Sequence, residues 1–350
     1  MDLIKEIDHY KKIIDYELEK LKERYLSLFK NYNQKSSCYL NQFIDFAKRG
    51  KGVRGALVFI TNNVFFDKKI EEGTLKKLAL VFEIVHSSLL IHDDIMDNDT
   101  LRRGKPTIHT FFNKKYAKFL KEKNDHLGKS LALSLGDIGF FIAFDILNTI
   151  DIKQSVKSFL SQELIKTGLA QIDDVLFSQT IIEPEIKEIL NIYKGKTSRY
   201  TFVLPVITVL KIKNLEAKKQ KIIEKILEDL GIIFQITDDL IGIFSKETGK
   251  DQASDIREDK KTIIRYFIFK SKNTPQSIKN LFGQEKITKM EIDKFESFIK
   301  QSEVIKKVEE IIIKIKNRIE EKIKKNKKIL PEKFNILVSN FIDYLITRKR

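Results

Sequence analysis

Apolar residues recur at helical spacing along most of this chain, and this periodicity constrains the fold more than any other feature. Between Glu303 and Lys328, valine and isoleucine return every three or four positions, with lysine and glutamate between them. The first 40 residues show the same amphipathic pattern. Because 350 residues include only 14 glycines and 5 prolines, turn formers are scarce. We therefore predict long helices.

Two segments, Leu75–Ile91 and Leu230–Phe244, carry apolar residues on nearly every face, which is typical of helices buried on all sides. We find no strand-like alternation of useful length, no internal repeat, and no linker rich in proline, glycine or serine. The sequence therefore predicts an all-α fold, a single-domain bundle of ten or more helices over residues 1–350, in which residues 1–40 form an N-terminal helical extension.

Composition and the cysteine count indicate a globular protein of a reducing compartment. A hydrophobic content of 42% with 25 phenylalanines excludes a disordered chain, although 33% of the residues are charged. The single cysteine, Cys38, cannot form an internal disulfide. The first residues show no secretion signal, and no uninterrupted apolar run of about 18 residues predicts a membrane span. We expect a cytoplasmic protein.

The formal net charge of +16 suggests three classes of partner: nucleic acid, an anionic membrane surface or a phosphorylated small molecule. Charge alone does not choose among them. The lysine-rich segment 322–328 has no interleaved aromatic residues and no arginine-rich arm, so we interpret it as a solvated basic face. A nucleic-acid-binding helical protein remains the non-enzyme alternative, but we expect no nucleic-acid partner.

The first apolar helix ends in acidic residues. His86, Asp93 and Asp97 share one helical stripe, and Asp93 and Asp97 lie one turn apart, about 6 Å along the axis. Two carboxylates at this spacing can reach a shared Mg²⁺. An acidic cluster at the end of an apolar helix is costly unless cations compensate it, although a solvated helix end is the simpler alternative.

Cations follow these acids directly. Arg102, Arg103 and Lys105 come within a few residues of Asp97. Carboxylate-bound Mg²⁺ beside guanidinium groups can hold a diphosphate, because each supplies positive charge to different oxygens. This pairing favours a metal site over a solvated helix end.

The second apolar helix repeats the arrangement. Asp238 and Asp239 end it, and the basic segment Lys246–Lys261 follows. Two acidic helix ends with adjacent cations predict two facing, metal-lined walls with an anionic substrate between them. A further pair, Asp173–Asp174, is equally well explained as ordinary helix surface.

A third basic element precedes the first acidic helix. Lys51 and Arg54 lie three residues apart, on one helical face. Gly50 and Gly52 flank Lys51 without the glycine spacing or the preceding strand of a phosphate-binding P-loop. We find neither a serine-histidine-aspartate arrangement nor histidine spacing suited to zinc.

In this order the segments resemble the trans-isoprenyl diphosphate synthases, head-to-tail prenyltransferases that make geranylgeranyl diphosphate and its relatives. The resemblance runs from about residue 40 to the C-terminus. The matching segments are Asp93–Asp97, Arg102–Gly104, Gln171 with Asp174, Gly195–Thr197, Phe234–Asp239, Gly249–Lys250, Ser254–Thr262, and the ending from Leu330–Pro331 to Arg348–Arg350.

The resemblance implies an isoprenoid synthase-like bundle around a central cavity, and it implies three Mg²⁺ ions. The implied metal ligands are Asp93, Asp94, Asp97, Asp238 and Asp239. The residues implied to act in catalysis are Asp93, Asp97, Asp238, Lys196 and Arg102. The implied substrate-binding residues are Lys51, Arg54, His86, Arg102, Arg103, Lys196, Thr197, Gln235, Lys250 and Lys260.

The resemblance also implies the reaction. Ionisation of an allylic diphosphate gives an allylic cation, which isopentenyl diphosphate attacks, and the departing diphosphate removes the final proton. Ser88 and Leu89 lie beneath the first acids, where aromatic residues limit the product of short-chain members. Neither is aromatic here, so we expect geranylgeranyl diphosphate or a somewhat longer product. The resemblance further implies a homodimer, and it leaves open a peripheral membrane contact for product release.

Four residues depart from the family pattern. The basic motif has Arg49 in place of its first glycine, Gly52 in place of its first arginine and Gly55 in place of its proline. In the second acidic motif, Gly242 stands where a third aspartate is common. These departures keep open a non-catalytic or regulatory subunit of a heteromeric synthase. A terpene cyclase would leave the predicted isopentenyl-binding residues without a purpose.

Overall fold

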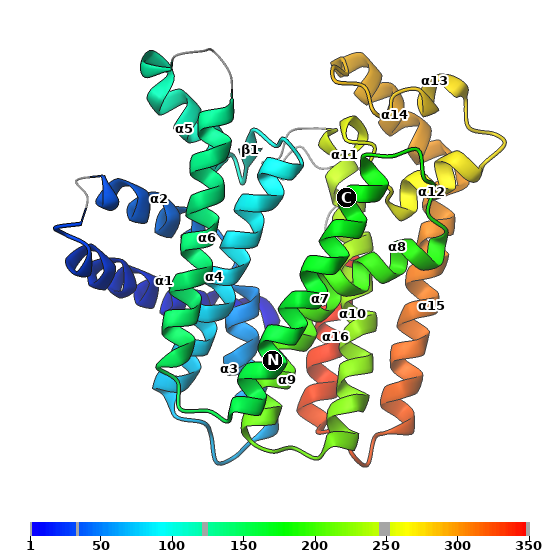
Figure 1. The fold of residues 1–350 in the computed structure, drawn as a ribbon. Helices are drawn as coiled ribbons and strands as arrows, with labels where there is room; N and C mark the ends of the chain where they lie inside the picture. The colour runs from blue at the N-terminus through cyan, green and yellow to red at the C-terminus, as the bar shows by residue number, and fades with distance from the viewer. Residues whose placement is uncertain (1, 33–34, 121–124, 245–252, 348–350) are drawn as a thin grey trace. The chain divides into compact units, whose positions relative to one another are not determined.

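The computed structural model describes residues 2–32, 35–120, 125–244 and 253–347, which are almost entirely helical (Figure 1). The prediction of an all-α fold with ten or more helices is confirmed for these residues. The chain divides into two compact units, Met1–Lys157 and Ser158–Arg350. The boundary falls inside one helix, α7 (Gln154–Ser178), and the prediction of a single domain stays a prediction.

Unit 1 consists of six helices before α7, a short 3₁₀ turn and a small hairpin. Their bounds are α1 (Leu3–Leu28), α2 (Ser36–Lys48), α3 (Val53–Phe65), α4 (Glu72–Met96), β1 (Leu101–Arg102), β2 (Lys105–Pro106), α5 (Ile108–Tyr116), η1 (Ala117–Phe119) and α6 (His126–Asn148).

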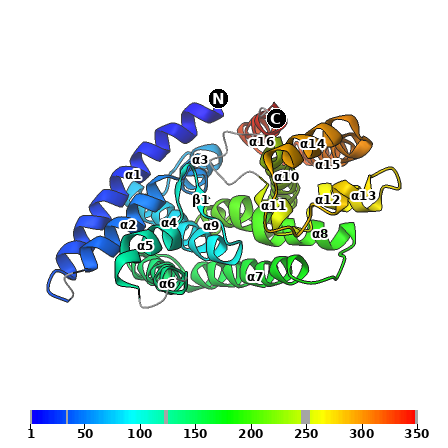
Figure 2. The same cartoon turned by 90° about the horizontal axis from the view of Figure 1, so that it is seen from above.

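Helix α1 shows how the amphipathic pattern becomes packing. The Asp2 carboxylate accepts a hydrogen bond from the Lys5 backbone N–H at 3.3 Å and so caps the first turn. Ile14, Leu18 and Leu21 are buried on the face that packs against α2, α3 and α4 (Figure 2). The apolar stripe predicted for the N-terminal residues therefore packs against these helices, and α1 covers them within unit 1.

Helices α4 and α6 run side by side in unit 1 (Figure 1). Two glycines of α6 permit this close approach, because a Cβ at Gly136 would collide with the His92 ring and a Cβ at Gly139 would collide with Ser88. By length and composition alone, α6 is also the single helix in the described ranges that passes the test for a membrane span. Buried core helices pass the same test, and 44% of its apolar window is buried.

A two-stranded hairpin follows α4, although the sequence shows no strand-like alternation of useful length there. Leu101 pairs with Pro106, and Arg102 pairs with Lys105. The two turn residues, Arg103 and Gly104, have φ values of 54° and 71°. Positive φ at both central positions is the type I′ geometry, which suits the twist of a tight hairpin. The turn therefore determines where the two adjacent arginines lie.

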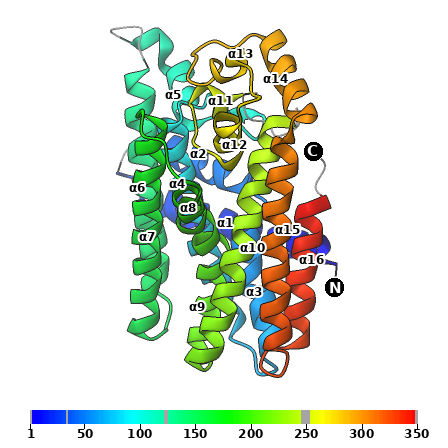
Figure 3. The same cartoon turned by 90° about the vertical axis from the view of Figure 1, so that its right-hand side faces the viewer.

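Unit 2 is built on the long helix α10. Helices α15 and α16 pack beside it (Figure 3). Its elements after α7 are α8 (Ile186–Ile192), η2 (Tyr193–Val203), α9 (Leu204–Ile212), α10 (Ala217–Phe244), α11 (Ser254–Arg257), α12 (Ile263–Lys270), α13 (Gln276–Lys279), α14 (Lys289–Gln301), α15 (Glu303–Lys325) and α16 (Glu332–Thr347).

Element η2 is an eleven-residue π-helix joined end to end with α8 and α9. Pro205, in the first turn of α9, has no N–H to give to the carbonyl of Thr201 four residues earlier, which favours the wider winding. Wide turns of this kind occur often at functional sites. Here the wide turns carry Lys196 and Thr197.

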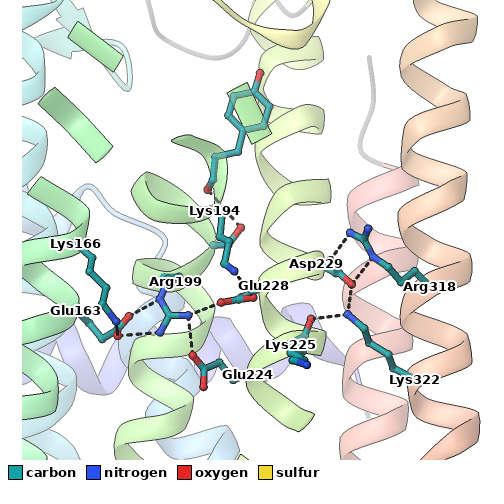
Figure 4. Close-up of polar contacts among 12 residues, drawn as sticks. Glu163, Lys166, Lys194, Arg199, Glu224, Lys225, Glu228, Asp229, Arg318 and Lys322 are labelled. Carbon is teal, nitrogen blue, oxygen red and sulfur yellow. Dashed lines mark hydrogen bonds and ion pairs between the residues drawn. The ribbon is translucent and has the colours of Figure 1, made fainter. Parts of the chain in front are cut away.

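Ion pairs hold η2 and α15 to their neighbours (Figure 4). Arg199 of η2 bonds to Glu163 of α7 and pairs with Glu224 and Glu228 of α10. On another face of α10, the Asp229 carboxylate accepts a hydrogen bond from Arg318 Nε at 2.9 Å. These contacts fix the wide helix against α7 and α10 within unit 2.

Candidate active site

One face of α4 remains partly exposed in unit 1. His86, Leu89 and Asp93 are partly exposed, whereas most of the helix between Leu75 and Ile91 is buried. These three residues are spaced by three and four positions, so they lie on one side of the helix. Asp97 caps the C-terminus of α4, and its N–H donates to the Asp93 carbonyl at 2.8 Å. The predicted stripe therefore carries Leu89 in its middle and Asp93 and Asp97 toward the C-terminal end of α4.

Arg102 lies among three carboxylates at the acidic end of α4. Its Nε donates to the Asp94 carboxylate, and its NH2 lies 3.3 Å from Asp99 Oδ2 and 3.6 Å from Asp93 Oδ2. Arg102 is only 8% exposed. These partners position Arg102 toward the acids of α4 rather than toward solvent. Its predicted role in binding substrate stays a prediction.

Asp94 lies differently from Asp93. Its side chain is fully buried, and its Oδ2 has no hydrogen-bond partner among the described residues. Burial, only partly offset by Arg102, raises the pKa of Asp94 to about 7. Asp94 therefore lies buried at the end of α4, where its carboxylate binds and orients Arg102. Among the predicted metal ligands of this segment, Asp93 is partly exposed and Asp97 is 8% exposed, and their roles stay predictions.

His86 lies in the electrostatic field of three arginines. Burial and the charges of Arg54, Arg103 and Arg102 hold the pKa of His86 well below its usual value. The charges of three arginines of unit 1 therefore lower the pKa of one imidazole, that of His86. His86 is accordingly neutral near pH 7, so it can donate a single N–H without adding charge.

The hairpin and the loop after α2 fit against each other. The Arg103 guanidinium lies over Gly50, where an added Cβ would be 3.1 Å from its NH1. Arg49 NH1 donates to the Pro106 carbonyl of β2 at 3.3 Å. Burial and the charge of Arg102 lower the pKa of Arg103 to about 10. Arg49, a departure from the family pattern, therefore ties the loop to the hairpin.

Glu83 is a polar residue of this region that the sequence analysis does not single out. It lies inside α4 and is 3% exposed. Its Oε1 accepts a hydrogen bond from the Gly55 N–H at 2.8 Å, at the first turn of α3. A carboxylate at a helix N-terminus is stabilised by the unpaired N–H groups there. A proline at position 55 could not donate this bond, so Gly55 adds a contact that the family pattern lacks.

The two predicted chain-length positions differ. Leu89 is partly exposed on the face that carries His86 and Asp93. Ser88 is fully buried against Gly139 of α6, and within the described part of the chain its Oγ has no hydrogen-bond partner. Only Leu89 therefore lies on the side of the predicted substrate. The role of either residue in setting product length stays a prediction.

In unit 2, α10 presents the second acidic pair. Asp238 is partly exposed, whereas Asp239 is 6% exposed and accepts hydrogen bonds from Tyr193 Oη and from Gln235 Nε2, the latter at 2.7 Å. The Thr197 hydroxyl donates to Gln235 Oε1 at 2.6 Å. Burial and the nearby Asp255 charge raise the pKa of Asp239 to about 8. Asp239 therefore joins α10 to η2, which leaves Asp238 better placed for metal.

Three predicted lysines complete the list. Lys196 Nζ on η2 lies 2.7 Å from Asp174 Oδ2 of α7, whereas Asp173 is exposed. Lys260 Nζ lies 3.5 Å from Glu258 and 3.8 Å from Asp255. Lys250 lies outside the described residues.

Gly242 has a specific neighbour. A Cβ at this position would lie 3.5 Å from Asp255 Oδ2. A third aspartate at Gly242 would bring a second negative charge against Asp255. The glycine therefore fits the approach of α11 to the end of α10.

The donor set is suited to magnesium held together with a phosphate. Within the described ranges no three aspartate, glutamate, histidine or cysteine side chains are close enough to hold a metal by themselves. Mg²⁺ usually takes one or two carboxylates and completes its octahedron with water and substrate phosphate oxygens. Asp93 with Asp97, and Asp238, match that requirement.

Comparison of folds defines the class first. Over 98% of this chain and 99% of the other, the structure resembles a geranylgeranyl pyrophosphate synthase of Corynebacterium glutamicum, with a TM-score of 0.88 and 19% identity. A geranylgeranyl pyrophosphate synthetase of Geoglobus acetivorans gives a TM-score of 0.74 at 23% identity, over 98% and 99% of the two chains. The fold is that of the all-α isoprenyl synthases.

Sequence comparison then gives the family. The family model described as polyprenyl synthetase matches residues 39–299. A short chain isoprenyl diphosphate synthase of Methanocaldococcus jannaschii is 28% identical over 72% of this chain and 73% of that protein. A geranylgeranyl diphosphate synthase of Saccharolobus solfataricus is 35% identical over 54% of each chain, so the match spans about half the length of that relative. The chain belongs to the polyprenyl synthetase family.

Proposed function

We propose that this protein is a head-to-tail prenyltransferase that condenses isopentenyl diphosphate with an allylic diphosphate. The observation that carries the proposal is the cationic region of unit 1, where Arg102 lies 3.6 Å from Asp93, the charges of Arg54, Arg102 and Arg103 act on His86, and His86 and Asp93 share one face of α4. Cations beside a carboxylate suit a diphosphate that arrives with a metal. Named relatives make geranylgeranyl diphosphate, which supports a product of similar length.

Asp93, Asp97 and Asp238 would hold magnesium together with the allylic diphosphate. The structure of the Corynebacterium glutamicum relative is described as a complex with isoprenyl diphosphate and magnesium, which supports this choice. Bound magnesium supplies positive charge to the leaving diphosphate and so favours cleavage of the carbon–oxygen bond. We propose three ions, the number implied by the family resemblance.

The chain's own cations would divide between the two substrates. We assign Lys51, Arg54 and Arg103 to the diphosphate of isopentenyl diphosphate, with the His86 N–H as a neutral donor beside them. Binding holds the double bond of this substrate near the allylic carbon, and such positioning lowers the entropic cost of reaction.

On the allylic side, we assign Arg102, Lys196, Lys250 and Lys260 to the departing diphosphate. The oxygens of the departing diphosphate take the final proton, so no side chain need serve as the base. The hydrogen-bonded Thr197 and Gln235 would face the allylic cation. Fixed dipoles of this kind stabilise developing charge without reorganisation.

We also propose a homodimer. Two helices expose apolar stripes at helical spacing, and each stripe suits a second copy of the chain because symmetric dimers pair identical surfaces. The exposed residues are Leu133, Ile138, Phe141 and Phe144 on α6, and Ile165, Leu169, Ile172 and Leu176 on α7. The lone cysteine supports a cytoplasmic location, and a peripheral membrane contact would allow an insoluble product to leave.

The test is turnover by the purified full-length chain. We would incubate it with Mg²⁺, isopentenyl diphosphate and, separately, dimethylallyl, geranyl and farnesyl diphosphate, and identify products by mass spectrometry. We expect a C20 or somewhat longer diphosphate. No product with any primer would overturn the proposal and would favour the non-catalytic subunit.

A further inference from the structure

The loop between α2 and α3 has a backbone that neighbouring residues restrain, and it carries one exposed lysine. Gly50 and Gly52 are buried, whereas Lys51 between them is exposed. Arg54 follows in the first turn of α3. The position of both cations therefore depends on what fixes the backbone of this loop.

Lys11 of α1 reaches the start of the loop. Its Nζ donates to the Lys48 carbonyl at 3.0 Å and also pairs with Asp15. Lys48 is the last residue of α2, where carbonyl groups have no partner within the helix. An ammonium group at this end also interacts favourably with the helix dipole. Lys11 therefore stabilises the end of α2 from a different helix.

The aliphatic part of Lys11 covers the end of the loop. Gly52 has a φ of +66°, and a Cβ there would lie 2.8 Å from Lys11 Cδ. A side chain at position 52 would thus be strained and would displace Lys11. The family pattern has arginine at this position, so the space that Gly52 leaves open is occupied by a residue of α1.

A second contact from α1 reaches the same residue. Glu19 Oε1 accepts a hydrogen bond from Lys48 Nζ at 2.5 Å. Helix α1 therefore binds both the carbonyl and the side chain of Lys48. Lys11 and Glu19 both precede residues 39–299, the part matched by the family model.

We propose that Lys11 is a positioning residue for the diphosphate of isopentenyl diphosphate. By capping α2 and covering Gly52, it fixes the loop so that Lys51 and Arg54 meet the ligand in one arrangement. The inference rests on the proposed function, because it takes Lys51 and Arg54 as the groups that bind this substrate.

The kinetic experiment compares three variants of the full chain. Lys11→Met keeps the aliphatic stem and removes the donor, Lys11→Arg restores a donor, and Lys20→Met is the matched control on α1, where Lys20 is half exposed and 3.7 Å from Glu17. We expect Lys11→Met to raise the KM for isopentenyl diphosphate roughly tenfold, the effect of one lost charge-assisted hydrogen bond. Lys11→Arg should recover most of this loss. The kcat, the KM for the allylic substrate and the control should change less than about twofold.

A structural measurement separates this inference from the proposed function. Amide hydrogen exchange over residues 48–55 should be faster in Lys11→Met than in the wild type or in Lys20→Met. This holds even if the wild type shows no turnover, in which case the proposed function fails and the positioning role is still tested. Should Lys11→Met fold poorly, Glu19→Gln should produce the same faster exchange at the loop. Unchanged exchange, or a KM that rises equally for both substrates, would overturn the inference.

Discussion

Arg199 and Glu163 form a bidentate ion pair between η2 and α7, with Nε 2.7 Å from Oε2 and NH2 2.8 Å from Oε1 (Figure 4). Glu163 is 2% exposed, so this carboxylate depends on the guanidinium and on Lys166 Nζ, at 2.8 Å, for its charge compensation. The pair holds the wide helix that carries the predicted Lys196 and Thr197.

Replacing Arg199 with methionine should destabilise the protein. The substitution leaves Glu163, Glu224 and Glu228 close together without their shared cation, and breaking a buried pair in this way costs about 3–5 kcal/mol. Urea unfolding followed by circular dichroism measures the effect. A loss similar to that of the exposed-pair variant Lys270→Met would contradict it.

Acid should weaken the same contact. Burial favours the neutral form of Glu163, but hydrogen bonds from Arg199 and Lys166 outweigh it and hold the pKa of Glu163 below its usual 4.5. Since the pKa is lower in the folded state, the contribution to stability is present above pH 4.5 and is lost as the pH falls through the folded value. Urea unfolding between pH 6 and about pH 3 should show a smaller decline in Glu163→Gln. Parallel curves would refute this assignment.

Asp93→Ala and Asp238→Ala should each lower kcat/KM by roughly a hundredfold or more, because each removes a carboxylate proposed to hold magnesium beside the leaving group. Steady-state assays over a range of Mg²⁺ concentrations measure this loss. Asp173→Ala, which changes an exposed aspartate, is the control and should remain active. Full activity in Asp93→Ala or Asp238→Ala would remove that residue from the proposed metal site.

Leu89→Phe should shorten the product, because Leu89 faces the same side of α4 as Asp93. Ser88→Phe, the substitution that the sequence spacing also suggests, should instead lower the melting temperature, since it forces an aromatic ring against Gly139. Mass spectrometry of the products and thermal unfolding distinguish the two outcomes. An unshortened product from folded Leu89→Phe would place the floor of the cavity elsewhere.

Phe141→Asp should convert the proposed dimer to a monomer, because Phe141 is 69% exposed on the apolar stripe of α6 and a carboxylate there is costly to bury. Phe119→Asp is a suitable control, since Phe119 is 81% exposed but lies off both stripes. Sedimentation equilibrium gives the mass of each variant. A wild-type monomer, or a Phe141→Asp dimer as stable as the wild type, would contradict the proposal.

The helices were predictable from the sequence because the residues that become buried recur with the period of an α-helix. Val308, Ile312 and Ile315 are spaced as the pattern requires, and all three are buried on α15. The hairpin at Leu101–Pro106 was not predictable, because two-residue strands show no alternation. Within the site, residue types and order indicated the chemistry, as for Asp93 and Arg102.

The spacing of apolar residues could not predict contacts between residues that are distant in sequence. Spacing gives the direction of Ser88 and Leu89 on α4, but not which of them meets α6. The bond between Tyr193 and Asp239 joins residues 46 positions apart, and no local signal announces it. Glu83 is a charged residue within an apolar segment, and this contrast could have identified it from the sequence.

The winding of η2 makes its register sensitive to chain length. A π-helix holds more residues per turn than an α-helix, so deleting one residue between Tyr193 and Val203 would allow ordinary winding to resume. Each residue on one side of the deletion would then rotate by about 100° about the axis relative to the other. The shortened helix would regain ordinary α-helical winding, but Lys196 would turn away from Asp174 of α7 and Thr197 would turn away from Gln235 of α10.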